Sequence, residues 1–291
     1  MSKLVNKIDF LMFICVNGAN PNGDPIDGNR PRTDLEGFGE ISDVCIKRKI
    51  RNRMQDMGQR IFVQSEDRCE DGCNSLKDRA EKFIGKAGDS KKAGFLPSNE
   101  YIRKACETFL DVRTFGQVFA LEKGVDESKG VSIPVRGPVS IHQAISIIPV
   151  EIETIKITKS VNNTTKDTKD SSTMGEKHFV KFGLYKIKGS INVQLAEKTV
   201  FSKEDADLVK KCLQTLFVND ASSARPDGSM EVVRLYWWEH NCKDGQYSSA
   251  TVHKSVVAKV KDGVQSPRSV DDYEFVETSL DGLTPEIING I

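Results

Sequence analysis

Polar and cationic residues gather in two neighbouring segments near the start of this 291-residue chain. Residues 17–25 are a turn-forming run of Asn, Gly, Asp and Pro that contains Asn20, Asn22 and Gly23. Residues 47–53 hold five basic residues in seven and no acid. A glycine-containing loop leaves backbone N–H groups open to a phosphate, and a basic helix neutralises the phosphate charge. The two segments together predict a nucleic-acid site, and a solvated loop beside a charged outer helix face is the alternative.

The elements around these segments have to position them. The apolar run over residues 8–16 predicts a buried strand, and a long loop follows it to about Ile41. Ser42 is the expected N-cap of a helix from Asp43 to about Met57, whose apolar residues Ile46, Ile50, Met54 and Met57 lie near one face. The cations of this helix point elsewhere, so it can pack and present charge together.

The rest of the chain alternates between core-forming and projecting segments. Residues 58–108 are polar, rich in Gly and Lys, and predict an insertion with one or two short helices. Residues 151–188 predict a hairpin arm whose polar tip, 159–173, should be mobile unless something binds it. Ser202 is the expected N-cap of a helix that extends to about Phe217, and strands are expected over 232–238 and 255–260. This mixed order predicts an α+β fold with a modified RRM or ferredoxin-like arrangement.

Composition excludes several classes of protein. Basic and acidic residues balance at 42 each, so the whole-chain charge favours no particular partner. No apolar run is long enough to span a membrane, and no export signal is visible, which predicts a cytoplasmic protein. The seven scattered cysteines then read as reduced thiols. Cys69 and Cys73 lack a second pair at ligand spacing, so neither a metal nor another cofactor is expected.

Seven motifs occur in a fixed order along the chain, at residues 20–25, 43–51, 113–116, 136–139, 173–178, 195–199 and 219–225. Together they resemble the backbone subunit of type I-C CRISPR Cascade, the seventh Cas family within the RAMP superfamily. The resemblance extends from the first strand to about His253. The type I-B backbone subunit shares the first two motifs, whereas Arg113-Thr114-Phe115-Gly116 and the 173–178 segment look more like type I-C. Glu176 departs from the basic residue common at its position in relatives.

The resemblance implies a fold, an assembly and a set of partners. The palm would comprise residues 1–57, 109–150 and 189–291, the finger-like insertion 58–108, and the thumb-like hairpin 151–188. Copies would polymerise head-to-tail along one CRISPR RNA and present it for pairing with target DNA. The other partners would be the type I-C guide-processing, large and small subunits, with a helicase-nuclease recruited to the complex.

Candidate RNA contacts follow from the residues and the resemblance together. The loop would set the register of the RNA and the helix would bind its phosphates through Lys47, Arg48, Lys49 and Arg51. Met174 is the candidate wedge beside a base, with an ordinary hairpin residue as the alternative. Lys177 and His178 follow it as phosphate or stacking partners. Arg113 and Arg136 are expected either to bind phosphates or to form structural ion pairs. Trp237 and Trp238 alternate along a strand, so core packing is expected on both faces.

The competing class is a RAMP-family ribonuclease that processes or cleaves RNA. The four histidines form no short catalytic constellation, but Asp24, Asp27 and Asp34 lie on the candidate RNA-binding loop. Asp-Pro and Asp-Gly are also ordinary turn sequences. The type I-C likeness implies a non-catalytic scaffold. A structural scaffold that binds no nucleic acid is the third alternative.

Overall fold

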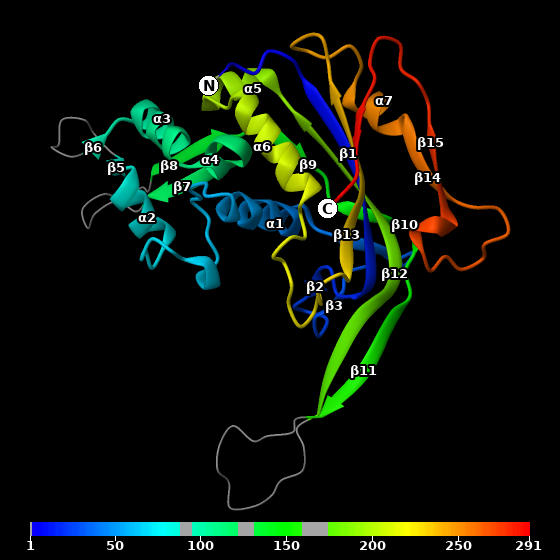
Figure 1. Ribbon diagram of the computed structural model, residues 1–291. Helices are drawn as coiled ribbons and strands as arrows, with labels where there is room; N and C mark the ends of the chain where they lie inside the picture. The colour runs from blue at the N-terminus through cyan, green and yellow to red at the C-terminus, as the bar shows by residue number, and fades with distance from the viewer. Residues whose placement is uncertain (1, 88–94, 122–130, 159–173) are drawn as a thin grey trace, which may run out of the picture.

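The computed structural model describes residues 2–87, 95–121, 131–158 and 174–291. A central antiparallel sheet runs in the order β16-β13-β1-β12-β10-β4, and β11 and β9 also pair with β12 (Figure 1). Its strands are β1 (Ile8–Ala19), β4 (Phe38–Ile41), β9 (Val139–Ile141), β10 (Ala144–Pro149), β11 (Ile152–Thr158), β12 (Met174–Ile191), β13 (Met230–Glu239) and β16 (Glu286–Ile288). The inner order β13-β1-β12-β10 is that of a ferredoxin-like βαββαβ unit, which confirms the predicted fold class.

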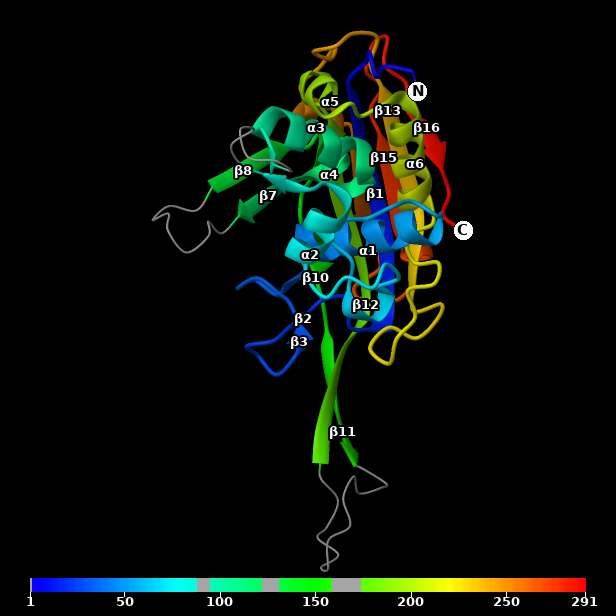
Figure 2. The same cartoon turned by 90° about the vertical axis from the view of Figure 1, so that its left-hand side faces the viewer.

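Two helices cover the first face of this sheet, α1 (Asp43–Asp56) and α6 (Lys203–Gln214) (Figure 2). The predicted N-caps are confirmed, because Ser42 Oγ accepts from Cys45 N at 3.3 Å and Ser202 forms a capping box with Asp205. Ile46, Ile50 and Met54 of α1 are buried in the core on this face. The short helix α5 (Val193–Thr199) joins β12 to α6.

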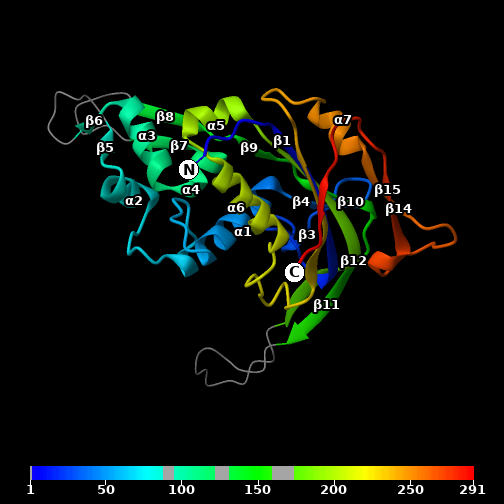
Figure 3. The ribbon, with the colours of Figure 1, turned by 45° about the horizontal axis from the view of Figure 1, so that its top comes forward.

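The second face is covered by the C-terminal region (Figure 3). Helix α7 (Ser249–Lys254), the hairpin of β14 (Val256–Val260) and β15 (Tyr273–Glu277), and a 3-10 turn at Val270–Asp272 lie there. Trp237 belongs to the core of the first face and Trp238 to that of the second. The alternation predicted for these two tryptophans is therefore confirmed.

A separate hydrophobic core holds together a unit beside the sheet (Figure 1). This unit contains a 3-10 turn at Glu66–Arg68, α2 (Leu76–Phe83), β5 (Lys86–Ala87), β6 (Phe95–Leu96), α3 (Ser98–Thr108), α4 (Leu110–Phe115), β7 (Gly116–Leu121) and β8 (Val131–Arg136). Phe62 and Tyr101 share this core with Phe109, Phe119 and Val135. The expected palm boundary at residue 109 thus falls inside a continuous core that runs on through Val135.

The predicted hairpin arm is a projection of the central sheet itself. Strand β12 is 18 residues long: its residues 174–179 pair with β11 alone, Val180 pairs with both β11 and β1, and the rest of the strand as far as Ile191 pairs with β1. Residues 181–188, expected in the arm, therefore lie in the sheet. The predicted mobile tip, 159–173, lies outside the described residues. In the described part of the chain, no helix is long and apolar enough to cross a membrane.

Candidate nucleic-acid interface

The loop between β1 and α1 is held in one conformation by its own polar side chains. Asn22 Oδ1 accepts hydrogen bonds from the Ser42 backbone N at 2.9 Å and from Ser42 Oγ at 2.8 Å. Asn20 Nδ2 donates to the Asn29 carbonyl at 2.7 Å. A Cβ at Gly23 would lie 2.9 Å from the backbone oxygen of Asn29 and closer still to the Asn29 side chain, so close packing favours glycine at this position. Asn20 and Asn22 therefore anchor the loop, and Gly23 allows the close pairing of β2 (Gly23–Asp24) with β3 (Arg30–Pro31).

The predicted cations of α1 all have partners within the chain. Lys47 pairs with Asp43 at 2.8 Å, and Arg48 donates to the Val63 carbonyl at 2.6 Å. Arg51 Nε donates to Asp111 Oδ2 at 3.0 Å, and its guanidinium stacks on Phe115. Lys49 is 5% exposed and pairs with Asp220. The helix thus uses three of these cations to bind distant segments of the chain, which neither the nucleic-acid prediction nor the alternative of a solvated outer face anticipates.

Arg32 and Arg225 lie close to Lys49, around Cys45. Arg32 was missed among the predicted site residues, and Arg225 belongs to the 219–225 motif but was not one of the predicted RNA contacts. Arg225 Nε lies 3.3 Å from Asp220 Oδ2, so Arg225 and Lys49 share one carboxylate. Arg32 pairs with Asp24 at 3.4 Å, while its Nε is buried without a partner in the described structure. Burial lowers the pKa of Lys49, against the opposing attraction of Asp220. These three cations leave a positive excess beside the N-terminus of α1, where the helix dipole also favours an anion.

A chain of polar contacts joins this loop to the base of the arm. Arg30 NH1 donates to Thr154 Oγ1 at 3.3 Å, and Thr154 Oγ1 lies 2.8 Å from His178 Nδ1. His178 is buried, and its Nε2 lies 3.8 Å from Glu176. The structure therefore brings the predicted loop and the predicted His178 together, although His178 contacts protein groups here.

The outer part of the arm exposes apolar side chains. Met174 is 69% exposed, Ile157 48% and Ile155 39%. Ile155 pairs with Lys177 and Ile157 with Gly175 in the hairpin, so these four residues share one face. Met174 lies on the opposite face with Glu176 and His178. Both faces of the arm thus carry apolar groups that find no partner in the described chain.

The two remaining predicted arginines differ in their surroundings. Arg113 is buried in α4 and forms a two-point ion pair with Asp205, Nε to Oδ2 at 3.0 Å and NH2 to Oδ1 at 2.9 Å. Arg136 is exposed at the end of β8, with no carboxylate partner among the described residues. Of the two, only Arg136 has a guanidinium free to meet a ligand in this conformation.

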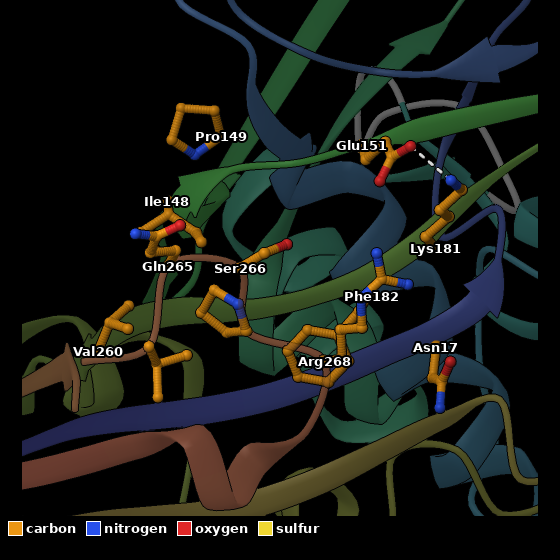
Figure 4. A pocket seen from close by; sticks show the side chains of 12 residues that line it. Asn17, Ile148, Pro149, Glu151, Lys181, Phe182, Val260, Gln265, Ser266 and Arg268 are labelled. Carbon is orange, nitrogen blue, oxygen red and sulfur yellow. Dashed lines mark hydrogen bonds and ion pairs between the residues drawn. The ribbon is translucent and has the colours of Figure 1, made fainter. Parts of the chain in front are cut away.

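An open cleft of about 620 Å³ lies at the base of the arm on the second face of the sheet (Figure 4). Phe182 and Pro149 form part of its apolar lining, and Asn17 and Arg268 add polar groups. Lys181 and Glu151 form an ion pair at its edge, drawn as a dashed line. The cleft is lined by elements that also carry the arm.

The carboxylates that a ribonuclease would need take part in loop structure. Asp34 Oδ1 accepts from the backbone N of Glu36 and Phe38, both at 2.9 Å. Asp24 Oδ1 accepts from Ile26 N at 3.0 Å, and Oδ2 pairs with Arg32. Across the described ranges, no group of three or more His, Cys, Asp or Glu side chains is placed to hold a metal ion. Both aspartates have a sufficient role as turn-forming acceptors.

Comparison with known proteins places the chain among relatives. A family model described as CRISPR-associated protein Cas7 matches residues 6–278. A CRISPR-associated protein Cas7 of Haloferax volcanii is 28% identical over 295 residues, covering 94% of this chain and 83% of that protein. A subunit from a structure described as a CRISPR RNA-guided surveillance complex, pre-nicking, aligns with a TM-score of 0.51 and 15% identity, over 89% of this chain and 84% of that one. A second surveillance-complex subunit aligns at a TM-score of 0.49 and 16% identity, over 89% and 78% of the two chains.

Proposed function

The chain belongs to the CRISPR-associated Cas7 family, and from that premise we propose that it is a guide-RNA-binding backbone subunit of a CRISPR surveillance complex. Copies of it polymerise head-to-tail along one CRISPR RNA and present the bases for pairing with target DNA. The motif likeness described above favours a type I-C complex in the cytoplasm. Its other partners are then the guide-processing, large and small subunits and a recruited helicase-nuclease.

The observation that carries this proposal is the arm. An outward hairpin with exposed Ile155, Ile157 and Met174 leaves apolar surface in water unless another molecule covers it. A projection on one copy that docks on a different surface of the next copy is a heterologous contact, which builds open helical filaments. A filament of this kind can follow a single-stranded RNA of any length.

The proposed RNA contacts divide according to what the side chains already bind. Met174 and Lys177 on the arm, Arg136, and the half-exposed Lys47 are available for direct contact. Arg32 and Arg225 offer their charge at the loop, while the buried Lys49 holds Asp220, the partner of Arg225. The other predicted residues position these groups through the contacts described above. They are Asn20, Asn22, Gly23, Arg48, Arg51, Arg113 and His178. Such a site binds backbone and leaves base edges free, so the RNA carries the sequence specificity.

The experiment is co-expression with a matching CRISPR array and the partner subunits, followed by mass measurement and sequencing of the bound nucleic acid. We expect uniform guide RNA in a large complex with several copies of this chain. Replacing Ile155 and Ile157 by Asn should shorten or abolish the assembly, while Val257→Asn with Val276→Asn, which removes an exposed apolar pair of the β14–β15 hairpin away from the arm, provides the matched control. A nucleic-acid-free monomer in the presence of the array and partners would contradict the proposal.

We further propose that the chain does not cleave RNA. The turn roles of Asp24 and Asp34 support this proposal, because they account for both carboxylates without a metal. RNA turnover should be equally absent in wild type, Asp24→Ala and Asp34→Ala. Metal-dependent cleavage that either substitution abolishes would favour the ribonuclease alternative.

A further inference from the structure

Four basic side chains meet on the second face of the sheet, the face opposite α1. Lys186 and Lys188 of β12 lie opposite Phe13 and Leu11 of β1, and so point toward α7. His253 of α7 donates from Nε2 to the Gly189 carbonyl at 3.0 Å. The His142 ring, in the turn between β9 and β10, lies 6.3 Å from the His253 ring. Lys186 Nζ donates to the carbonyls of His253 at 3.3 Å and Val256 at 3.0 Å.

This cluster has no carboxylate of its own. In the described parts of the chain, none of its four members forms an ion pair with an acid. Asp9 is the carboxylate that acts on His253; its Oδ2 is bound by Lys7 at 3.2 Å and by His240 at 2.9 Å, while its Oδ1 is buried without a partner in the described structure. Two lysines and two imidazoles are therefore held beside each other in a half-buried setting without a paired acid, at a cost to the fold whenever they are charged.

The ionisation of the cluster reflects the same crowding. Burial, and to a lesser extent Lys188, lower the pKa of Lys186 to about 8. Burial is also the main cause that lowers the pKa of His253, aided by His142 and Lys188 and opposed by the Gly189 carbonyl and Asp9. A bound anion would offset this repulsion and return both groups toward their charged forms.

Several donors of the cluster remain open. Lys186 uses two of its three protons on carbonyls, and Lys188 uses none on a partner that the described structure contains. His253 Nδ1 and both nitrogens of His142 are likewise unbound among described residues. His142 is exposed, Lys186 and Lys188 are half-buried and His253 is buried, so the cluster meets solvent at His142 and the two lysines. A tetrahedral oxyanion can accept from several such donors at once.

We infer that His142, Lys186, Lys188 and His253 form a phosphate site that binds a nucleic-acid strand on the face of the sheet opposite α1. The choice of nucleic acid over another polyanion rests on the proposed function. The site would give the subunit a second phosphate contact, remote from the loop and α1. Either an RNA or a DNA strand can supply the phosphate.

The test uses the full chain with ¹⁵N-labelled histidine, at fixed pH. The protein is titrated with inorganic phosphate and then with twelve-nucleotide oligo-U and oligo-dT. Each ligand should shift the His142 and His253 imidazole resonances saturably. Lys188→Gln should weaken the phosphate response about tenfold, the loss expected for one charged hydrogen bond. Lys243→Gln removes an exposed cation paired with Glu197 and should leave the response unchanged.

Three outcomes would overturn the inference. They are resonances that do not move, a Lys188→Gln response equal to that of wild type, and a response to poly-glutamate without one to either oligonucleotide. The result is separable from the proposed function. A wild type that responds to oligonucleotides but never assembles on guide RNA would contradict the backbone proposal and leave this site standing.

Discussion

Arg113 and Asp205 form a buried two-point ion pair that fastens α4, part of the core beside the sheet, to the first turn of α6. Asp205 also accepts from the Ser202 backbone N at 2.9 Å, so one carboxylate both caps α6 and holds the arginine. The side chains are 9% and 6% exposed, which leaves little water to compensate either charge. This pair links the two cores that the described chain builds on either side of α4.

Arg113→Met should therefore destabilise the protein strongly. Breaking a buried pair leaves an uncompensated charge, with a cost of about 3–5 kcal/mol in the free energy of unfolding. Denaturant titration measures this loss. The double variant Arg113→Met with Asp205→Asn should lose less, because no isolated charge remains. Arg103→Met, which removes an exposed pair with Glu107, is the control and should cost about 1 kcal/mol or less.

Asn22→Ala should loosen the start of α1. The substitution removes the acceptor for both Ser42 N and Ser42 Oγ, so we expect a loss of about 1–2 kcal/mol in unfolding free energy. Asn22→Asp keeps the acceptor oxygen and adds negative charge near the helix N-terminus, so it should retain most of the stability. An Asn22→Asp protein as unstable as Asn22→Ala would show that the contact with Ser42 is not what holds the loop.

Substitutions at Lys47 and at Lys49 should affect RNA binding and stability separately. Lys47→Gln removes a half-exposed cation and should lower the slope of log K against log salt for single-stranded RNA by about 0.7, the value for one phosphate. Its unfolding free energy should change by less than about 0.5 kcal/mol. Lys49→Met removes the buried partner of Asp220 and should cost about 1.5–3 kcal/mol in unfolding free energy. The reverse assignment of the two effects would contradict the placement of these side chains.

Much of the architecture could be predicted from local sequence, because local patterns determine it. The apolar run of β1, the N-caps Ser42 and Ser202 and the alternation of Trp237 and Trp238 depend on neighbours a few residues away. The partners of the α1 cations could not be predicted in this way. Asp220 is 171 residues from Lys49 and Asp111 is 60 residues from Arg51, so only the folded chain brings them together. Arg32 was also missed, because no local periodicity distinguishes it.

Lys186 provides the last prediction, a stability difference that depends on pH. Its pKa in the folded protein is about 8, below the value of about 10.4 for an unperturbed lysine. Below pH 8 both states are charged and the folded state bears the full cost of the buried charge. Between these two values the unfolded chain binds more protons, so wild type should gain stability relative to Lys186→Met as pH rises.

Unfolding of both proteins in phosphate-free buffers from pH 7.5 to 10.5 measures the gap between their unfolding free energies. The lost bonds to the His253 and Val256 carbonyls add an offset that is nearly constant with pH, because the neutral amine also donates. A gap that stays constant over this range would mean that Lys186 is not destabilised in its charged form.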